Sequence, residues 1–331
     1  MLALHACAPS SSYLEVDSSV AALPPDVIWI DLLSADAKEI VFVERATGLH
    51  VPTFDELSEI ESSSRLRLEN HALYLSAPMI SRAESTDPRT TPVGFVLTKS
   101  LLITVRFEPL TAFRSFVERR ARSDEPNMGS VEAFTGLLDT IVDRIADVLE
   151  GVESELDEVS RRIFRTGVDD ATAKRRPARE NADLRNILRR VGGAGDLVSK
   201  IRDSLLGIGR ILPYVMGQST DLLTADVKQR FESMRQDVVS LNDYDAHLVN
   251  KVQLLLDATL GLINVEQNNI IKVLTIVSVI GVPPTLVASL YGMNFKYMPE
   301  LNWAWGYPYA IGIIGLSAVL PLLWFKLRGW L

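Results

Sequence analysis

The sequence VLTIVSVIGVPPTLVASLYGMN occupies residues 273–294, and WAWGYPYAIGIIGLSAVLPLLWF follows at residues 303–325. Neither stretch contains Asp, Glu, Lys or Arg. A helix of about 20 apolar residues crosses the ~30 Å hydrocarbon core of a bilayer. The pattern therefore predicts two membrane spans joined by a short loop. A buried hairpin in a soluble protein is the weaker alternative.

The residues that flank the two spans indicate their orientation. Lys272, Lys326 and Arg328 lie at the outer ends, whereas the loop contains Lys296 alone. Because basic residues favour the cytoplasmic side, both chain termini are expected in the cytoplasm. We expect spans at 272–294 and 307–327, an external loop at 295–306 and a cytoplasmic tail at 328–331. Aromatic residues typical of membrane interfaces cluster at the ends of the second span, namely Trp303, Trp305, Tyr307, Tyr309, Trp324, Phe325 and Trp330.

The composition narrows the class of protein. The chain has 331 residues, a formal charge of −8 and a single cysteine, Cys7. A negative net charge argues against a nucleic-acid partner, and one cysteine excludes an internal disulfide. No basic residue precedes Lys38, so the N-terminus lacks a secretory signal and the first 270 residues are expected in the cytoplasm. We expect no covalent cofactor.

Residues 1–125 alternate short apolar runs with helical patterns, which predicts a small α/β domain. The expected strands are VIWIDLL (27–33), ALYLSAP (72–78), VGFVLT (93–98) and LLITVRF (101–107). Helices are expected at 35–46, 53–60 and 109–122, with Ser34, Thr53 and Pro109 at their starts. The polar segment 82–92 is the expected exposed loop.

Residues 126–217 change to a helical pattern. Apolar residues recur every three or four positions from Val131 to Ile163, and a second pattern runs from Arg179 to Leu212. A polar turn at 167–170 separates the two patterns, and a glycine cluster at 192–195 predicts that the second helix is broken or loosened there. We expect the two helices to pack as an antiparallel pair.

The segment that follows predicts a very long helix. No proline occurs between Pro213 and Pro283, and a continuous helix over this distance would be roughly 100 Å long. A domain of this size cannot bury such a helix, so most of it must project or pack on copies of itself. Residues 218–271 are thus expected to form a cytoplasmic stalk that leads into the first span. The predicted fold is an α+β cytoplasmic domain, a stalk helix and two C-terminal transmembrane helices.

The hydroxyl groups of the first span lie on one face. At 100° per residue, Thr275, Ser278, Thr285 and Ser289 fall within an arc of about 80°, and Asn268 lies about 20° outside it. Apolar residues share or border this stripe, namely Ile271, Leu274 and Val282. The stripe fits either a helix–helix interface or the wall of a water-containing pore with apolar constrictions. A pore would require several copies around an axis, because two spans cannot enclose one.

The loop and its flanks resemble the CorA family of divalent-cation channels. The resemblance rests on YGMNF and YMPEL in the loop, on VSVIGVPPTLVASLYGMNF in the first span and on the terminal FKLRGWL. It implies a funnel-shaped homopentamer in the bacterial inner membrane that admits hydrated Mg2+, with Co2+ and Ni2+ as accepted substitutes. Zinc transporters of the ZntB type are the alternative, although they usually differ within the triplet and lack the MPEL sequence.

The resemblance also implies roles for individual residues. Asn294 would present a ring of amide oxygens to the water shell of Mg2+, which gives up water reluctantly. Gly292 would allow a tight turn, and Met293 would pack beneath the loop. The alternative role of Asn294 is to cap the helix. The implied pore-lining positions, together with the remaining hydroxyls of the stripe, are Asn268, Ile271, Leu274, Ser278, Val282, Thr285 and Ser289, with Ile271 at the cytoplasmic constriction.

Two further expectations concern charge. Lys296 stands where the family commonly has glutamate, so it would weaken cation concentration at the mouth unless it pairs with Glu300. The family senses cytosolic Mg2+ through carboxylates between subunits, which makes Mg2+ a regulatory ligand as well as the substrate. The candidate acids are Asp139, Asp143, Asp147, Glu150, Glu153, Glu155, Asp157 and Glu158 in the first long helix, and Asp226, Glu232, Asp237, Asp243 and Asp245 in the stalk.

Two other classes of protein compete with a channel. A membrane-anchored enzyme is disfavoured because His5, His50, His71 and His247 are scattered and each is expected to be structural or exposed. A membrane-tethered scaffold could use the stalk as a coiled coil. No GxxxxGK[ST] sequence is present, which agrees with transport that needs no nucleotide.

Overall fold

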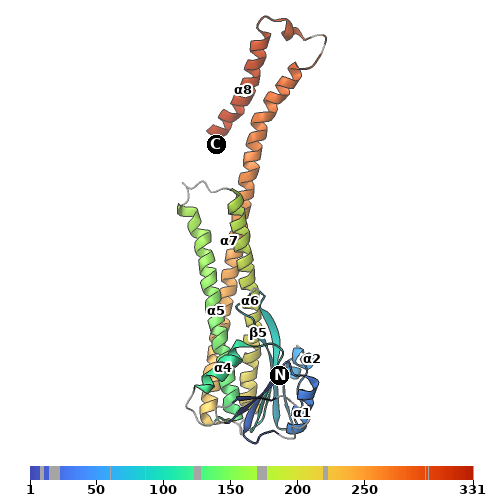
Figure 1. Ribbon diagram of the computed structural model, residues 1–331. Helices are drawn as coiled ribbons and strands as arrows, with labels where there is room; N and C mark the ends of the chain where they lie inside the picture. Colours follow the sequence, from blue (N-terminus) through green and yellow to red (C-terminus); the bar gives the residue numbers. More distant parts are fainter. Residues whose placement is uncertain are drawn as a thin grey trace. The chain divides into compact units, whose positions relative to one another are not determined.

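The computed structural model describes residues 1–7, 11–14, 23–59, 61–85, 87–122, 128–169, 177–218, 223–294, 296 and 298–330 (Figure 1). The chain divides into two compact units. One comprises Met1–Ala173 and Asn186–Leu256, and the other comprises Lys174–Arg185 and Asp257–Leu331.

A seven-stranded mixed sheet organises the N-terminal region. Its strand order is β2-β1-β3-β7-β6-β5-β4, and β3 pairs with β7 in parallel while the other neighbours are antiparallel. The prediction located β3, β5, β6 and β7 but missed β1, β2 and β4, which have only four or five residues each. The strands are β1 Leu2–Ala6, β2 Ser11–Leu14, β3 Val27–Leu33, β4 Leu66–Glu69, β5 Ala72–Ser81, β6 Arg89–Leu97 and β7 Leu102–Arg106.

Short helices cover the sheet, with α1 and α2 on one side in Figure 1 and α4 on the other. They are α1 Ala37–Thr47, α2 Phe54–Ser58, α3 Ser62–Arg65 and α4 Thr111–Ala121. Thr53 caps α2 as predicted, but Asp36 rather than Ser34 caps α1, in a capping box with Glu39. Ser34 instead has a φ of 44° and donates to the Phe107 carbonyl at 2.7 Å. The expected loop at 82–92 is shorter than predicted because β6 begins at Arg89.

A buried polar network fixes the centre of the sheet. The Arg106 guanidinium donates to both carboxylate oxygens of Asp31, at 3.0 and 2.7 Å, and Thr104 donates to Asp31 at 2.7 Å. His5 stacks on Trp29 with ring centroids 4.0 Å apart. Burial lowers the pKa of His5 to about 4, so the ring is neutral at physiological pH. His5 is therefore a structural residue, as expected.

Three long helices pack on one another: α5 Ser130–Asp169, α6 Pro177–Gln218 and the first part of α7 Ala225–Tyr291. Of these, α5 contacts β3, β6 and β7, and Gly207 of α6 lies against Ala77 of β5. The Arg190 guanidinium lies 3.0 Å from Glu155 on α5, and the Arg202 guanidinium lies 2.7 Å from Asp245 on α7. Residues with higher numbers on α7 contact residues with lower numbers on α6, as with Gly195 beside Val252 and Gly209 beside Val238. The helix α6 therefore runs antiparallel to α7, and α7 runs alongside α5 in the same direction, because Asp139 pairs with Arg230 and Asp157 pairs with Lys251. The division of residues 126–217 as a helical pair stays a prediction.

The glycine cluster does not break α6, which contradicts the prediction. Gly192, Gly193 and Gly195 all lie in a continuous helix. A Cβ atom on Gly195 would come within 3.2 Å of the Val252 Cγ1 atom, so the missing side chain allows α7 to approach. The polar turn also begins later than expected, because α5 continues through Gly167 to Asp169, and Asp170 lies outside the described residues.

The C-terminal region consists of two apolar helices. The first is the end of α7, which continues through Pro283 and Pro284 to Tyr291, and the second is α8 Gly306–Leu327. A short 3-10 helix, η1 Pro299–Asn302, lies between them. Both α7 and α8 contain a segment long and apolar enough to cross a membrane. Because α7 is continuous, the expected division between stalk and span at 271/272 stays a prediction. The expected boundary at 125/126 falls outside the described residues.

Candidate functional site

The apolar part of α7 has two different faces. One face is partly buried and carries Lys272, Ile276, Ile280, Pro283, Val287 and Tyr291. The Lys272 ammonium lies 5.6 Å from the centre of the Trp330 ring, just beyond α8, so α8 runs back beside this face (Figure 1). The candidate stripe points about 150° away from this face at ~100° per residue. Its residues are all exposed in the single chain, namely Asn268, Ile271, Leu274, Thr275, Ser278, Val282, Thr285 and Ser289.

Exposed apolar side chains alternate with hydroxyls along this stripe. Ile271, Leu274 and Val282 are 60%, 65% and 60% exposed. The hydroxyl of Thr275 donates to the Ile271 carbonyl at 2.8 Å, and that of Thr285 donates to the Gly281 carbonyl at 2.8 Å. Because the hydrogens of these two hydroxyl groups are donated to backbone carbonyls, the lone pairs of the hydroxyl oxygens remain available to accept hydrogen bonds. The stripe thus offers neutral oxygen acceptors separated by apolar rings.

The glycine–methionine–asparagine triplet follows the last turn of α7. The Gly292 amide donates to the Ala288 carbonyl at 3.0 Å, and the Met293 amide donates to Leu290 at 3.3 Å. The described glycines with positive φ are Gly48 and Gly329, so the turn at Gly292 does not demand glycine through backbone strain. Asn294 is exposed directly beyond the helix end, and no side-chain cap by Asn294 occurs among the described contacts.

Two expectations about the loop stay predictions, because the single chain does not show the contacts that they require. Met293 is 43% exposed, so it does not pack beneath the described part of the loop. Lys296 and Glu300 form no ion pair, although both lie within the described residues, and Lys296 is exposed.

Gly306, at the start of α8, is a loop-shaping residue that sequence reasoning missed. A Cβ atom there would lie 2.2 Å from the Glu300 carbonyl oxygen, which excludes any side chain without movement of the backbone. The Gly306 amide donates to Trp303 at 3.1 Å and closes the turn after η1. The dipeptide Trp305–Gly306 before an apolar run was the available signal.

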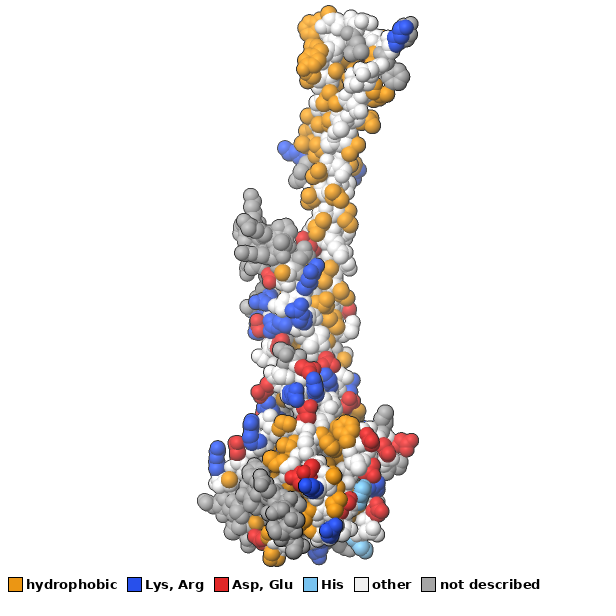
Figure 2. All heavy atoms as spheres, turned by 45° about the vertical axis from the view of Figure 1, so that its right-hand side comes forward, with side chains coloured by type: hydrophobic (Ala, Val, Ile, Leu, Met, Phe, Trp, Pro, Cys, Tyr) orange, Lys and Arg blue, Asp and Glu red, His pale blue; other side chains and the backbone are white. Residues whose placement is uncertain are grey.

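The hairpin surface is mainly hydrophobic, with charged side chains near its ends (Figure 2). Arg328 lies over the Trp324 ring at 5.6 Å, and Phe325 stacks on Trp330 at 5.5 Å. Amphipathic aromatic rings beside basic groups are typical of a membrane interface. This arrangement agrees with the predicted interfacial belt around the end of α8.

Most of the candidate regulatory carboxylates are engaged within the chain. Asp157 lies 2.7 Å from Lys251, Asp139 lies 3.4 Å from Arg230, and Glu153 accepts a hydrogen bond from Tyr244. Burial, and then the charge of Asp139, raise the pKa of Asp143. The described residues contain no group of three or more His, Cys, Asp or Glu side chains that could hold a metal. Among the described residues, the candidates with neither an ion pair nor a side-chain hydrogen bond are Glu150, Asp226, Asp237 and Asp243.

An α+β domain, a long helix that continues into an apolar segment and a second apolar helix define a class of membrane protein with a large N-terminal domain. The family model described as CorA-like Mg2+ transporter protein matches residues 25–327. The chain belongs to this family. It is 34% identical over 304 residues to the magnesium transport protein CorA of Haemophilus influenzae, with 92% of each chain covered.

Solved structures share the fold. The complete CorA magnesium transporter from Methanocaldococcus jannaschii is similar at a TM-score of 0.71 and 19% identity, covering 100% of this chain and 99% of that one. The ZntB cytoplasmic domain from Vibrio parahaemolyticus is similar at a TM-score of 0.56 and 14% identity, covering 80% of this chain and 98% of that one. The second likeness is confined to the fold, whereas the sequence relationship favours magnesium transport over the zinc alternative.

Proposed function

We propose that the chain transports Mg2+ through a pore formed by several copies, with the exposed stripe of α7 as the pore wall. The observation that carries this proposal is the orientation of that stripe, which lies opposite the α8 side and leads to Asn294 at the helix end. Family membership supports Mg2+ as the substrate. Five copies would complete the funnel that the resemblance implies, in the bacterial inner membrane with both termini cytoplasmic.

The chemistry of Mg2+ agrees with neutral side chains at the mouth. Mg2+ holds its octahedral water shell tightly, so a filter acting on the hydrated ion must accept hydrogen bonds from water. The amide oxygen of Asn294 can do so, and a ring of such oxygens would select by size and hydrogen bonding. Co2+ and Ni2+ form hydrated dications of similar geometry, so we expect both to enter.

Below this mouth, apolar side chains would control conduction. Ile271, Leu274 and Val282 would form narrow rings that exclude water when the copies approach closely. Thr285, Ser278, Ser289 and Asn268 would rehydrate the path between the rings. We propose that cytosolic Mg2+ favours the closed state by screening carboxylates between copies, with Glu150, Asp226, Asp237 and Asp243 as the remaining candidates.

Asn294→Ala tests the proposal against its matched control, Asn302→Ala. Asn302 is an exposed amide in the same loop region but does not adjoin the end of α7. In proteoliposomes, Asn294→Ala should lower Mg2+ uptake at least about tenfold, because a hydrogen bond to a charged partner contributes ~1.5–3 kcal/mol. Asn302→Ala should retain uptake.

Three further measurements complete this test. Native mass spectrometry of both variants should give the same number of copies as the unmodified protein. Co2+ and Ni2+ should compete with Mg2+, and Zn2+ should not be preferred. Full uptake by Asn294→Ala, with the same assembly, would exclude the filter role.

A further inference from the structure

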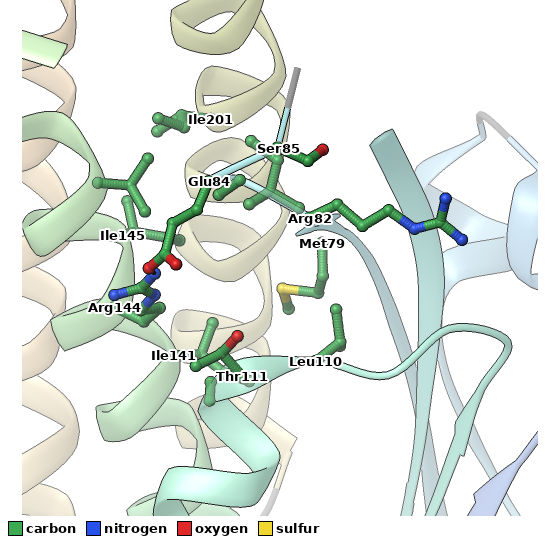
Figure 3. Close-up of a pocket in the computed structure, with 14 residues that line it drawn as sticks. Met79, Arg82, Glu84, Ser85, Leu110, Thr111, Ile141, Arg144, Ile145 and Ile201 are labelled. Carbon is green, nitrogen blue, oxygen red and sulfur yellow. Dashed lines mark hydrogen bonds and ion pairs between the residues drawn. The ribbon is translucent and has the colours of Figure 1, made fainter. Parts of the chain in front are cut away.

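A cavity of about 380 Å³ lies in the N-terminal unit, and its lining contains no residue of the candidate pore stripe (Figure 3). Four elements enclose it: the end of β5 with the turn at 82–85, the start of α4, the middle of α5 and one turn of α6. This volume falls in the range of sites for small organic ligands. The cavity plays no part in the proposed transport path.

The inner wall of the cavity is apolar and firmly packed. Met79, Leu110, Ile141, Ile145 and Ile201 line it, and none of them is more than 6% exposed. They come from β5, α5, α6 and the residue before α4, so the wall is held by the core of the domain rather than by loops. Such a wall favours a compact apolar group.

The polar groups lie at the mouth. Figure 3 shows the Arg144 guanidinium and the Glu84 carboxylate side by side, where they form an ion pair. Arg144 is 27% exposed and extends from α5, whereas Glu84 is 83% exposed and belongs to the short turn. Arg82 points away from the mouth in Figure 3, and its guanidinium lies 3.4 Å from Glu108. Arg144 is therefore the cation that faces the cavity.

The start of α4 adds positive potential beside Arg144. Its N-cap residue, Leu110, provides no side-chain hydrogen bond, and the first turn contains no acidic residue. Thr111 and Ala112 line the cavity, so the uncapped end of this 11-residue helix adjoins it. Free amides and the helix dipole both favour a negative group at such an end.

We propose that this cavity binds a small organic anion with a compact apolar body and one carboxylate or phosphate group. The apolar body would occupy the space beside Ile141, Ile145 and Ile201, and the anionic group would replace Glu84 on Arg144. This exchange is favourable because Glu84 can return to water, and exposed ion pairs contribute little to stability. The ligand would bridge β5 and α4 to α5 and α6, which pack on α7.

The experiment uses the full-length protein in lipid nanodiscs and 4-phenylbutyrate as the probe, with neutral 4-phenylbutanamide as its matched analogue. Isothermal titration, corrected with empty nanodiscs, gives each affinity. The carboxylate should bind saturably and at least about tenfold more tightly than the amide, since charge-assisted hydrogen bonds are roughly twice as strong as neutral ones. Equal affinities, or no saturable binding, would overturn the proposal.

Two exposed substitutions test the role of the ion pair. Arg144→Gln should remove the preference for the carboxylate, whereas Glu84→Gln should tighten carboxylate binding by removing its competitor. Arg235 and Glu232 form a comparable exposed pair on α7, outside the cavity, so Arg235→Gln and Glu232→Gln are the matched controls. Equal effects at both pairs would show that only the general surface charge matters and would contradict a site.

Ile145→Phe tests the cavity itself by filling it. The variant should lose binding of both analogues while retaining its assembly state and its melting temperature within a few degrees. Because a buried substitution can unfold the domain, the exposed Glu84→Gln variant remains the deciding arm. Weaker carboxylate binding by Glu84→Gln would overturn the assigned exchange.

Discussion

The two parts of α7 differ in how their apolar side chains are shielded from water. In the first part, Phe231, Met234 and Val238 are at most 2% exposed because α5 and α6 cover them. In the second part, Val273, Leu274 and Val277 are more than 60% exposed. One helix thus passes from a segment whose apolar stripe a single chain can bury to a segment that carries no charged residue on any side between Lys272 and Lys296. The second part requires lipid or other copies of the chain to cover it.

The largest expected effect would separate these two parts directly. Phe231→Ala should destabilise the N-terminal unit by about 3–5 kcal/mol, because it removes a fully buried ring that lies 6.2 Å from that of Phe134. Leu286→Ala, at a position 60% exposed, should leave this unit unchanged. Hydrogen exchange would show faster exchange in α5 and α7 for Phe231→Ala alone. A comparable loss of protection in Leu286→Ala would show that the N-terminal unit also depends on the second part of α7, which contradicts this prediction.

Glycine-to-alanine substitutions should change the free energy of unfolding by an intermediate amount, and the change should depend on how closely each glycine is packed. A Cβ atom on Gly207 would lie 2.7 Å from that of Ala77, so Gly207→Ala should cost about 1–3 kcal/mol through overpacking of α6 on β5. Nothing lies within 4 Å of such an atom at Gly192 in α6 or Gly315 in α8. Gly192→Ala should stabilise the helix by up to ~1 kcal/mol. Thermal unfolding of the three alanine variants gives the ranking, and a larger loss at Gly315 would indicate close packing of α8 in the assembly.

The smallest expected effect concerns pH, to which the N-terminal unit and the apolar hairpin should respond differently. Burial lowers the pKa of His50, but hydrogen bonds and charges from Glu56 and Glu44 outweigh it and raise that pKa above its ordinary value of 6.5. Because the pKa of His50 is higher in the folded than in the unfolded protein, the protonated side chain stabilises the folded N-terminal unit. This stabilisation is fully present below pH 6.5 and is lost as the pH rises through the folded-state pKa.

His50→Gln should remove this pH dependence. The change should be less than about 1 kcal/mol, since the His50 side chain is 46% exposed. Unfolding of the N-terminal unit at pH 5.5 and 8.5, compared between the unmodified protein and the variant, measures it. The hairpin has no charged residue between Lys272 and Lys296, so its helices should not respond over this range. An unchanged pH profile in the variant would assign the dependence to other groups.

Sequence alone determined the elements whose patterns are long and regular. Two uncharged apolar stretches predicted both C-terminal helices, and the recurrence of apolar residues predicted α5, α6 and the continuous α7. The stripe from Ile271 to Ser289 was also readable, because helical periodicity fixes which side chains share a face. These features depend on neighbours along the chain, so they need no knowledge of the fold.

Tertiary structure decided what depends on contacts between distant segments. Strands β1 and β4 are too short to stand out, and their pairing with β3 and β5 stabilises them. The glycine cluster at 192–195 predicted a break or a loosening, yet α6 is continuous there, and at Gly195 the missing side chain lets Val252 of α7 approach. Only the fold shows that the stripe of α7 lies opposite its α8 side and that Arg144 meets Glu84 across 60 residues. Long-range packing, which local propensity does not encode, is the physical reason for this division.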